Sequence, residues 1–319
     1  MKELKIFGIV AVFTLVLYWG VEPFAHSQMH KHVEGHGFVY DGKADIEAAK
    51  EAKKEDVVKT KEAFWANVAT ISKLKGDATA GEAVFATCMG CHMEGAPNMG
   101  GAIPPSLEHA GALYDKNYLI ALIKDPAMAS NVDHKYADTS THPMGSIKMM
   151  MTDDQQIADV VAYLKEKKAG EVTTKEAFSD ACGRCHAMRY AQTSQLGDIP
   201  KFKYKKDELA YQVKILEEQE LVQKYMGKLP PDLSIIIRAR GHHFLETFIE
   251  NPQSQLPGTS MPRVGLSEEG FHKVMTYLEE TGDSHKADRD NLGWKVILFF
   301  VIFSVLAYLW KKQVWSKLH

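Results

Sequence analysis

The pentapeptides CMGCH, at residues 88–92, and CGRCH, at residues 182–186, contain every cysteine of this chain of 319 residues. In each of them a histidine directly follows the second cysteine. This is the signature of covalent c-type haem attachment, because two thiols add to the vinyl groups of one macrocycle and the histidine ligates its iron. A zinc knuckle or a thioredoxin-like redox site has the same cysteine spacing but does not require the histidine. The sequence therefore predicts two haems and electron transfer.

The two motifs supply six predicted haem-binding side chains, four for covalent attachment and two as proximal iron ligands. These are Cys88, Cys91, Cys182 and Cys185 for attachment, and His92 and His186 for the iron. Covalent haem attachment takes place outside an energy-transducing membrane, so we expect the haem-bearing part in the periplasm or its equivalent. A hydrophobic content of 45% and a net charge of -3 are typical of a globular chain and argue against a nucleic-acid partner.

The N-terminal end carries an almost unbroken apolar run at residues 6–21, preceded by two lysines. A run of this kind predicts either a retained membrane anchor, which we favour, or a cleaved signal peptide. We assign residues 1–24 to this anchor or signal.

A second apolar run, residues 294–310, lies near the C-terminal end. It predicts a transmembrane helix, and the lysines that follow it place the C-terminus in the cytoplasm by the positive-inside rule. Those lysines are Lys311, Lys312 and Lys317. We assign residues 287–319 to this helix and its tail, in the inner membrane.

Between the two apolar ends lie a helical spacer and an internal repeat. We place the spacer at residues 25–76, in which residues 45–75 predict one long solvated helix. The repeat consists of copy one, residues 77–169, and copy two, residues 170–286. Each copy holds one haem motif, so the repeat predicts two tandem domains.

Both copies are expected to open and close with a helix. Phe85 lies ahead of the first motif and Phe178 ahead of the second, and the closing amphipathic helices carry Tyr163 and Tyr277. We expect each phenylalanine to meet the tyrosine of its own copy where the two helices cross. The predicted N-caps of the closing helices are Thr152 and Ser267.

A proline-stiffened loop follows each motif, with Pro105 in copy one and Pro231 in copy two. Such a loop can present a carbonyl to the far nitrogen of the ligating histidine. This hydrogen bond would set the orientation of the imidazole and tune the iron, so we include both prolines among the cofactor-binding residues.

A sixth iron ligand is expected between the proline-ended helix and the closing helix of each copy. Met261 is the only methionine in that loop of copy two and is the predicted ligand. In copy one we predict Met144, with His142 as the alternative, while the run Met149–Met151 is expected to pack as core. The choice matters, because a second imidazole in place of a thioether lowers the reduction potential.

Copy two carries an insertion at about residues 188–227 that copy one lacks. Residues 206–226 predict a helix whose surface is mostly charged, with one apolar stripe. The stripe consists of Leu209, Val213, Leu216 and Leu221. We interpret the insertion as a docking or shielding element for a partner, with a decorative surface helix as the alternative.

Both copies resemble class I cytochromes c, which makes the expected fold all-α, with two tandem cytochrome c domains between N-terminal and C-terminal transmembrane helices. Residues 170–319 more specifically resemble cytochrome c1, the c-type subunit of quinol:cytochrome c oxidoreductase, the bc1 complex. The resemblance rests on LPPDLS at residues 229–234, RARG at 238–241, Met261 with Pro262, and the tail at 311–317.

This resemblance implies an electron-transfer subunit that is not catalytic alone and that works with cytochrome b and the Rieske iron–sulfur subunit in a dimeric complex. The second haem would accept electrons from the Rieske protein, with Arg238 and Arg240 near its propionates. Electrons would then pass to the first haem and on to a downstream c-type cytochrome. The additional haem domain and the N-terminal anchor depart from the single-haem pattern and indicate a dihaem variant of the subunit.

Two other functions stay open at this point. The dihaem subunit of a cbb3-type oxidase also has an N-terminal anchor before two such motifs, but it does not need the c1-like C-terminal tail. A dihaem peroxidase needs one iron with an open sixth position, and a plausible methionine in each copy counts against it.

Overall fold

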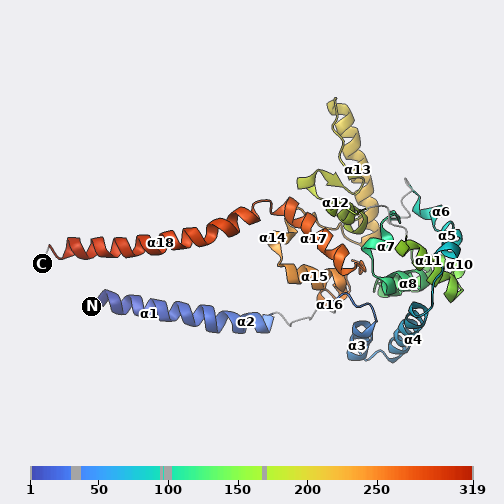
Figure 1. The fold of residues 1–319 in the computed structure, drawn as a ribbon, viewed down its shortest axis with the longest axis horizontal. Coiled ribbons are helices and arrows are strands. Elements are labelled where there is room, and N and C mark those ends of the chain that lie inside the picture. The colour runs from blue at the N-terminus through green and yellow to red at the C-terminus, as the bar shows by residue number, and fades with distance from the viewer. Residues whose placement is uncertain (1, 30–36, 94–95, 97–102, 167–170, 318–319) are drawn as a thin grey trace. The chain divides into compact units, whose positions relative to one another are not determined.

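The computed structural model describes residues 2–29, 37–93, 96, 103–166 and 171–317, which are mostly helical (Figure 1). The strands in this part of the chain are β1 (Thr193–Ser194) and β2 (Gly197–Asp198), a short antiparallel pair in the insertion of copy two. The predicted all-α class is therefore confirmed.

Packing divides the chain into two compact units, and each unit takes segments from both copies of the repeat. Unit 1 consists of residues 1–73, 117–152 and 246–265, and unit 2 of residues 74–116, 153–245 and 266–319. The tandem domain boundaries follow the sequence repeat rather than these contacts, and they stay a prediction.

Unit 1 holds the spacer and the loops after the proline-ended helices. Its elements are α1 (Lys2–Val16), η1 (Leu17–Val21), α2 (Glu22–Met29), α3 (Lys43–Glu51), α4 (Glu55–Ser72), α8 (Lys116–Lys124), α9 (Pro126–Ala129), η2 (Asp133–Lys135), η3 (Thr139–Thr141), α10 (Ile147–Met150), the end of α15 (His242–Glu250) and α16 (Pro252–Gln255).

The spacer differs from the single solvated helix that we predicted. It forms two helices, α3 and α4, because Lys53 adopts a left-handed conformation with φ of 55° between them. The inner face of α4 is buried through Trp65, Val68 and Ile71, so this segment contributes to the core of unit 1. Residues 30–36 of the spacer lie outside the described residues.

Unit 2 holds both haem motifs and both closing helices. Its elements besides the two strands are α5 (Ala78–Phe85), α6 (Met89–His92), α7 (Ala110–Leu113), α11 (Asp154–Glu166), α12 (Thr174–Phe178), η4 (Ser179–Gly183), η5 (Arg189–Ala191), α13 (Lys205–Met226), α14 (Ile236–Ala239), the start of α15, α17 (Glu268–Gly282) and α18 (Lys286–Trp315).

The expected crossings of opening and closing helices are present in both copies. The ring centroids of Phe85 and Tyr163 lie 5.1 Å apart where α5 meets α11, and those of Phe178 and Tyr277 lie 5.0 Å apart where α12 meets α17. In copy one the approach is so close that a Cβ at Gly81 would collide with the backbone of α11. The contacts between these aromatic rings stabilise the helices that flank the motifs.

The N-caps of the closing helices match the prediction in one copy only. Ser267 caps α17, since its hydroxyl accepts the N–H of Gly270 at 3.1 Å. At the start of α11 the side chain that accepts a helix N–H is Asp153, which bonds Gln155 at 3.0 Å, and not Thr152. The predicted cap was therefore one residue early, because Asp153 is an equally good cap.

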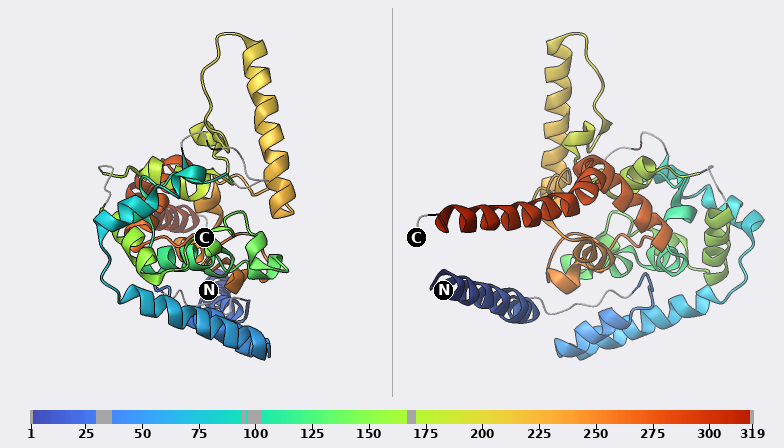
Figure 2. Two further views of the ribbon diagram at one scale, coloured as in Figure 1. Left: turned by 90° about the vertical axis from the view of Figure 1, so that its right-hand side faces the viewer. Right: turned by 60° about the vertical axis from the view of Figure 1, so that its left-hand side comes forward.

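The insertion forms the predicted helix, α13, which extends away from the other helices of unit 2 (Figure 2). Its only fully buried residue is Val222. The apolar stripe of the prediction is exposed along its whole length, between 41% at Leu221 and 58% at Leu216.

Each end of the chain forms one helix that is long and apolar enough to cross a membrane. The first comprises 24 residues, Lys2–Ala25, and the second 30 residues, Lys286–Trp315. Neither is buried within the structure. An apolar surface on all sides of an unburied helix fits a lipid environment, which supports membrane anchoring at both ends.

Candidate haem sites

The two haem motifs form the same helical turn. In copy one the N–H groups of Cys91 and His92 bond the carbonyl of Cys88 at 3.2 and 3.0 Å, and in copy two those of Cys185 and His186 bond Cys182 at the same distances. Residues three apart in such a turn lie on one face, so both thiols can reach one macrocycle. The chemistry and local geometry of both motifs fit a covalently bound haem c.

The far nitrogen of each proximal histidine bonds the predicted proline carbonyl. The distance from Nδ1 of His92 to the carbonyl oxygen of Pro105 is 2.8 Å, and that from His186 to Pro231 is also 2.8 Å. With Nδ1 as the donor, Nε2 of each imidazole is available for the iron. The expected contacts are present, and the residues' roles toward haem stay a prediction.

Burial lowers the pKa of both proximal imidazoles below the usual value for histidine. At His92 the positive charge of Arg184 adds to this effect, while the hydrogen bond to Pro105 opposes it. The neutral imidazole is the form that ligates iron, so both environments favour the ligating state.

The predicted sixth ligands lie in unit 1, whereas the cysteines and proximal histidines lie in unit 2. Met144 is half-buried in a turn, and its N–H donates to Nδ1 of His142 at 3.0 Å. Burial lowers the pKa of His142 to about 4, so this alternative ligand is a neutral imidazole. Met144, with His142 as the alternative, stays a prediction.

The methionine run after Met144 packs only partly as we expected. Met151 is buried with 4% exposure, but Met149 and Met150 are 77% and 54% exposed. The reason is the short helix α10, which turns these two side chains outward and Ile147 inward. The expectation of core packing was therefore wrong for Met149 and Met150.

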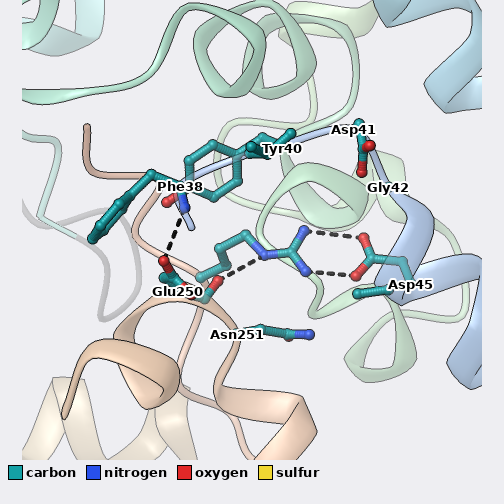
Figure 3. A pocket seen from close by; sticks show the side chains of 10 residues that line it. Phe38, Tyr40, Asp41, Gly42, Asp45, Glu250 and Asn251 are labelled. Atoms are coloured by element: carbon teal, nitrogen blue, oxygen red, sulfur yellow. Dashed lines mark hydrogen bonds and ion pairs between the residues drawn. The ribbon is translucent and has the colours of Figure 1, made fainter. Parts of the chain in front are cut away.

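The loop with Met261 is held by a buried ion pair that the sequence did not reveal (Figure 3). Arg263 donates to both carboxylate oxygens of Asp45, at 3.0 and 2.5 Å, and to the carbonyl of Glu250 at 3.0 Å. Asp45 comes from the spacer and is 3% exposed, against 5% for Arg263. The N–H of Phe38 also donates to the carboxylate of Glu250, the last residue of α15, at 2.9 Å, so the spacer is bound both to this loop and to the helix that precedes it.

Polar contacts that were not predicted join the segment of the second motif to copy one. Nδ1 of His109 lies 2.9 Å from a carboxylate oxygen of Asp180 in the π-helix η4, which leads into the motif. Arg184, inside the motif, donates from a terminal nitrogen to the carbonyl of Ile103 at 3.1 Å. No single-sequence signal marks such pairs, because their partners lie far apart in the chain.

Arg238 and Arg240, which the resemblance assigned to the haem propionates, lie in and directly after α14 and are exposed. The guanidinium of Arg240 stacks over the ring of Phe244 at 5.0 Å. Their role toward the propionates stays a prediction.

Comparison with known proteins gives matches in both halves of the chain. Residues 78–168 match the Cytochrome c family, and residues 267–318 match the Cytochrome C1 family. Cytochrome c1 of Allochromatium vinosum is 21% identical over 203 residues, which cover 44% of this chain and 82% of the relative.

The findings support a c1-type cytochrome. A c1-type cytochrome carries covalently bound haem c and takes part in electron transport, and the matched regions include the first motif and the C-terminal apolar helix. A solved structure titled "Hyperthermophilic respiratory Complex III" aligns with 46% of this chain and 75% of its own, at 24% identity and a TM-score of 0.36. That likeness is too low to add to the inference.

Proposed function

We propose that this c1-type cytochrome binds two haems and carries electrons in a quinol:cytochrome c oxidoreductase, from a Rieske iron–sulfur protein to a downstream c-type cytochrome. The observation that carries the count of two is the repeated local geometry. Each motif has the same turn, and each proximal histidine meets a proline carbonyl at 2.8 Å. A chance CxxCH sequence would not come with this second contact.

The chain's own residues would set the redox properties of each site. When bound, haem c supplies a one-electron couple between ferric and ferrous iron. The carbonyls of Pro105 and Pro231 fix the tautomer and the plane of the imidazoles and raise their basicity. If Met144 or Met261 supplied a thioether to the iron of its copy, that ligand would favour the ferrous state and raise the potential.

We further propose that the partners are cytochrome b and the Rieske subunit in a dimeric complex. Support comes from the Cytochrome C1 match at residues 267–318 and from the relative named Cytochrome c1. The motifs that resemble cytochrome c1 and the Cytochrome C1 match both lie in the second half of the chain. Copy two is therefore the proposed receiver of Rieske electrons, and copy one the proposed donor to the downstream cytochrome.

The proposed orientation places the haem-bearing region in the periplasm and the C-terminus in the cytoplasm. Covalent haem attachment requires the outer compartment for the motifs, and Lys311 and Lys312 follow the apolar part of α18 directly. A C-terminal epitope should then resist protease in sealed right-side-out spheroplasts and become accessible after lysis. Cleavage of the epitope before lysis would contradict this orientation and indicate a periplasmic C-terminus.

The decisive experiment is purification from native membranes in mild detergent, with identification of the associated subunits and an assay of antimycin-sensitive quinol:cytochrome c reductase activity. We expect cytochrome b and a Rieske protein to co-purify with that activity, and two covalent haems per chain by pyridine haemochrome and intact mass. Co-purifying haem-copper oxidase subunits would instead support the dihaem oxidase subunit. Peroxide turnover with one high-spin haem would support a peroxidase.

A further inference from the structure

Arg184 occupies the second variable position of the CxxCH motif of copy two, yet its side chain contacts copy one. One terminal nitrogen of its guanidinium donates to the carbonyl of Ile103 at 3.1 Å. Its Nε is buried and has no hydrogen-bond partner among the described residues. A positive charge that is partly withdrawn from water in this way acts over a longer distance than one at the surface.

The carbonyl that Arg184 bonds belongs to the loop that orients the proximal histidine of copy one. Ile103 lies two residues before Pro105, and the carbonyl of Pro105 is the partner of His92. The charge of Arg184 also acts on the imidazole of His92. One side chain of the second motif is thus connected to the proximal ligand of the first.

Two further contacts hold the same segments together. His109 pairs with Asp180, with side chains only 13% and 18% exposed, and the hydroxyl of Tyr114 donates to the carbonyl of Asp180 at 3.4 Å. Asp180 lies in the π-helix that leads into Cys182. Because three contacts connect the turn of copy two to copy one, Arg184 has little freedom to swing away from the loop.

We propose that Arg184 is a positioning residue for the haem of copy one. Arg184 holds the Ile103–Pro105 loop, which contacts His92, and its charge raises the reduction potential of that haem. Reduction of the iron removes one positive charge from the site, so a nearby fixed cation stabilises the ferrous state. The inference rests on the proposed dihaem function. The effect of Arg184 would also set the direction of electron transfer, because a higher potential in copy one draws electrons from copy two.

The test is Arg184→Gln in the full-length, detergent-purified protein, with the midpoint potentials of both haems measured by spectroelectrochemistry. At a fixed applied potential we expect the ratio of reduced to oxidised copy-one haem to fall about tenfold, which is about 59 mV for one electron. The copy-two haem should shift less. The variants that lack one attachment site, Cys88→Ala with Cys91→Ala and Cys182→Ala with Cys185→Ala, assign the two potentials, because each keeps one covalent haem.

Two further variants separate charge from structure. Arg184→Lys keeps the charge and should retain the wild-type ratio within about twofold. Arg189→Gln is the matched control, because it removes an arginine charge from the same copy at a side chain that is 83% exposed. It should leave the potential of copy one unchanged.

Each outcome has a distinct meaning. Two haems per chain with an unchanged copy-one potential in Arg184→Gln would overturn the role of Arg184 and leave the proposed function standing. One haem per chain in the wild type would overturn the dihaem function itself. If Arg184→Gln fails to incorporate haem, Arg184→Lys decides, and a tenfold fall in its copy-one ratio would refute the charge effect.

Discussion

Copy one and copy two reach the same local geometry from different lengths of chain. Phe85 lies three residues before Cys88, whereas Phe178 lies four residues before Cys182. Copy two absorbs the additional residue in the π-helix η4, where the wider turn accommodates it without moving the phenylalanine from its tyrosine. The helix crossing is thus preserved while the spacing is not.

The second difference between the copies is the insertion, which also changes the spacing without changing the contact. The insertion, residues 188–227, lies between His186 and Pro231, yet the hydrogen bond between these two residues has the same length as the one between His92 and Pro105. The insertion leaves through the β1–β2 pair and α13, and the chain returns to the same place. The contact between the proximal histidine and the proline carbonyl is therefore kept, although the segment that connects these two residues differs in length.

The largest expected effect comes from removing one attachment site at a time. Cys88→Ala with Cys91→Ala, or Cys182→Ala with Cys185→Ala, should each reduce the covalent haem content from two per chain to one, measured by pyridine haemochrome. If copy two receives the electrons, only its loss should prevent reduction of the remaining haem by quinol in the complex.

The opposite pattern, with the copy-one variant unable to accept electrons from quinol, would reverse the proposed order of the haems. Cys88→Ser with Cys91→Ser is a useful companion, since it keeps the polarity of the turn while removing the thioether bonds.

The next comparison concerns the sixth ligands. Met261→His should lower the potential of the copy-two haem by a substantial part of the roughly 0.8 V range that axial ligands span, and Met144→His should do the same in copy one. Potentiometric titration with optical detection checks both. If His142 is the ligand of copy one, Met144→Ala will leave the potential unchanged and His142→Ala will raise the population of high-spin haem.

A smaller effect is expected from the buried pair that holds the Met261 loop. Asp45→Asn leaves the guanidinium of Arg263 buried without its counter-ion, which costs about 3–5 kcal/mol in the free energy of unfolding. Thermal unfolding followed by circular dichroism measures this loss.

Lys43→Gln serves as the control, because it breaks an exposed pair with Asp41 on the same segment and should leave the melting temperature unchanged. Equal destabilisation by both variants would show that burial of the Asp45 pair is not what matters.

The smallest effect on stability is expected on α13, the element that copy one lacks. Val213→Ser and Leu216→Ser alter exposed positions and should change the free energy of unfolding by less than about 0.5 kcal/mol. Val222→Ala, at the buried end of the same helix, should cost more. If α13 docks a partner, the serine variants will still reduce reductase activity or subunit co-purification, and unchanged values would favour a decorative helix.

The sequence by itself determined the helical class, the two haem motifs, the apolar ends, and the pairing of Phe85 with Tyr163 and of Phe178 with Tyr277. These features were readable because each depends on short-range spacing or on the comparison of two copies of one pattern. The proline loops were found for the same reason.

The tertiary structure alone decided which distant side chains meet. Asp45 comes from the spacer and Arg263 from copy two, and Arg184 reaches Ile103 in the other copy. A charged residue in a sequence reads as solvated unless its partner is known, so the spacer was taken for an exposed helix although Trp65 and Ile71 are buried. Burial and pairing over long sequence separations are properties of the folded chain, and no local pattern encodes them.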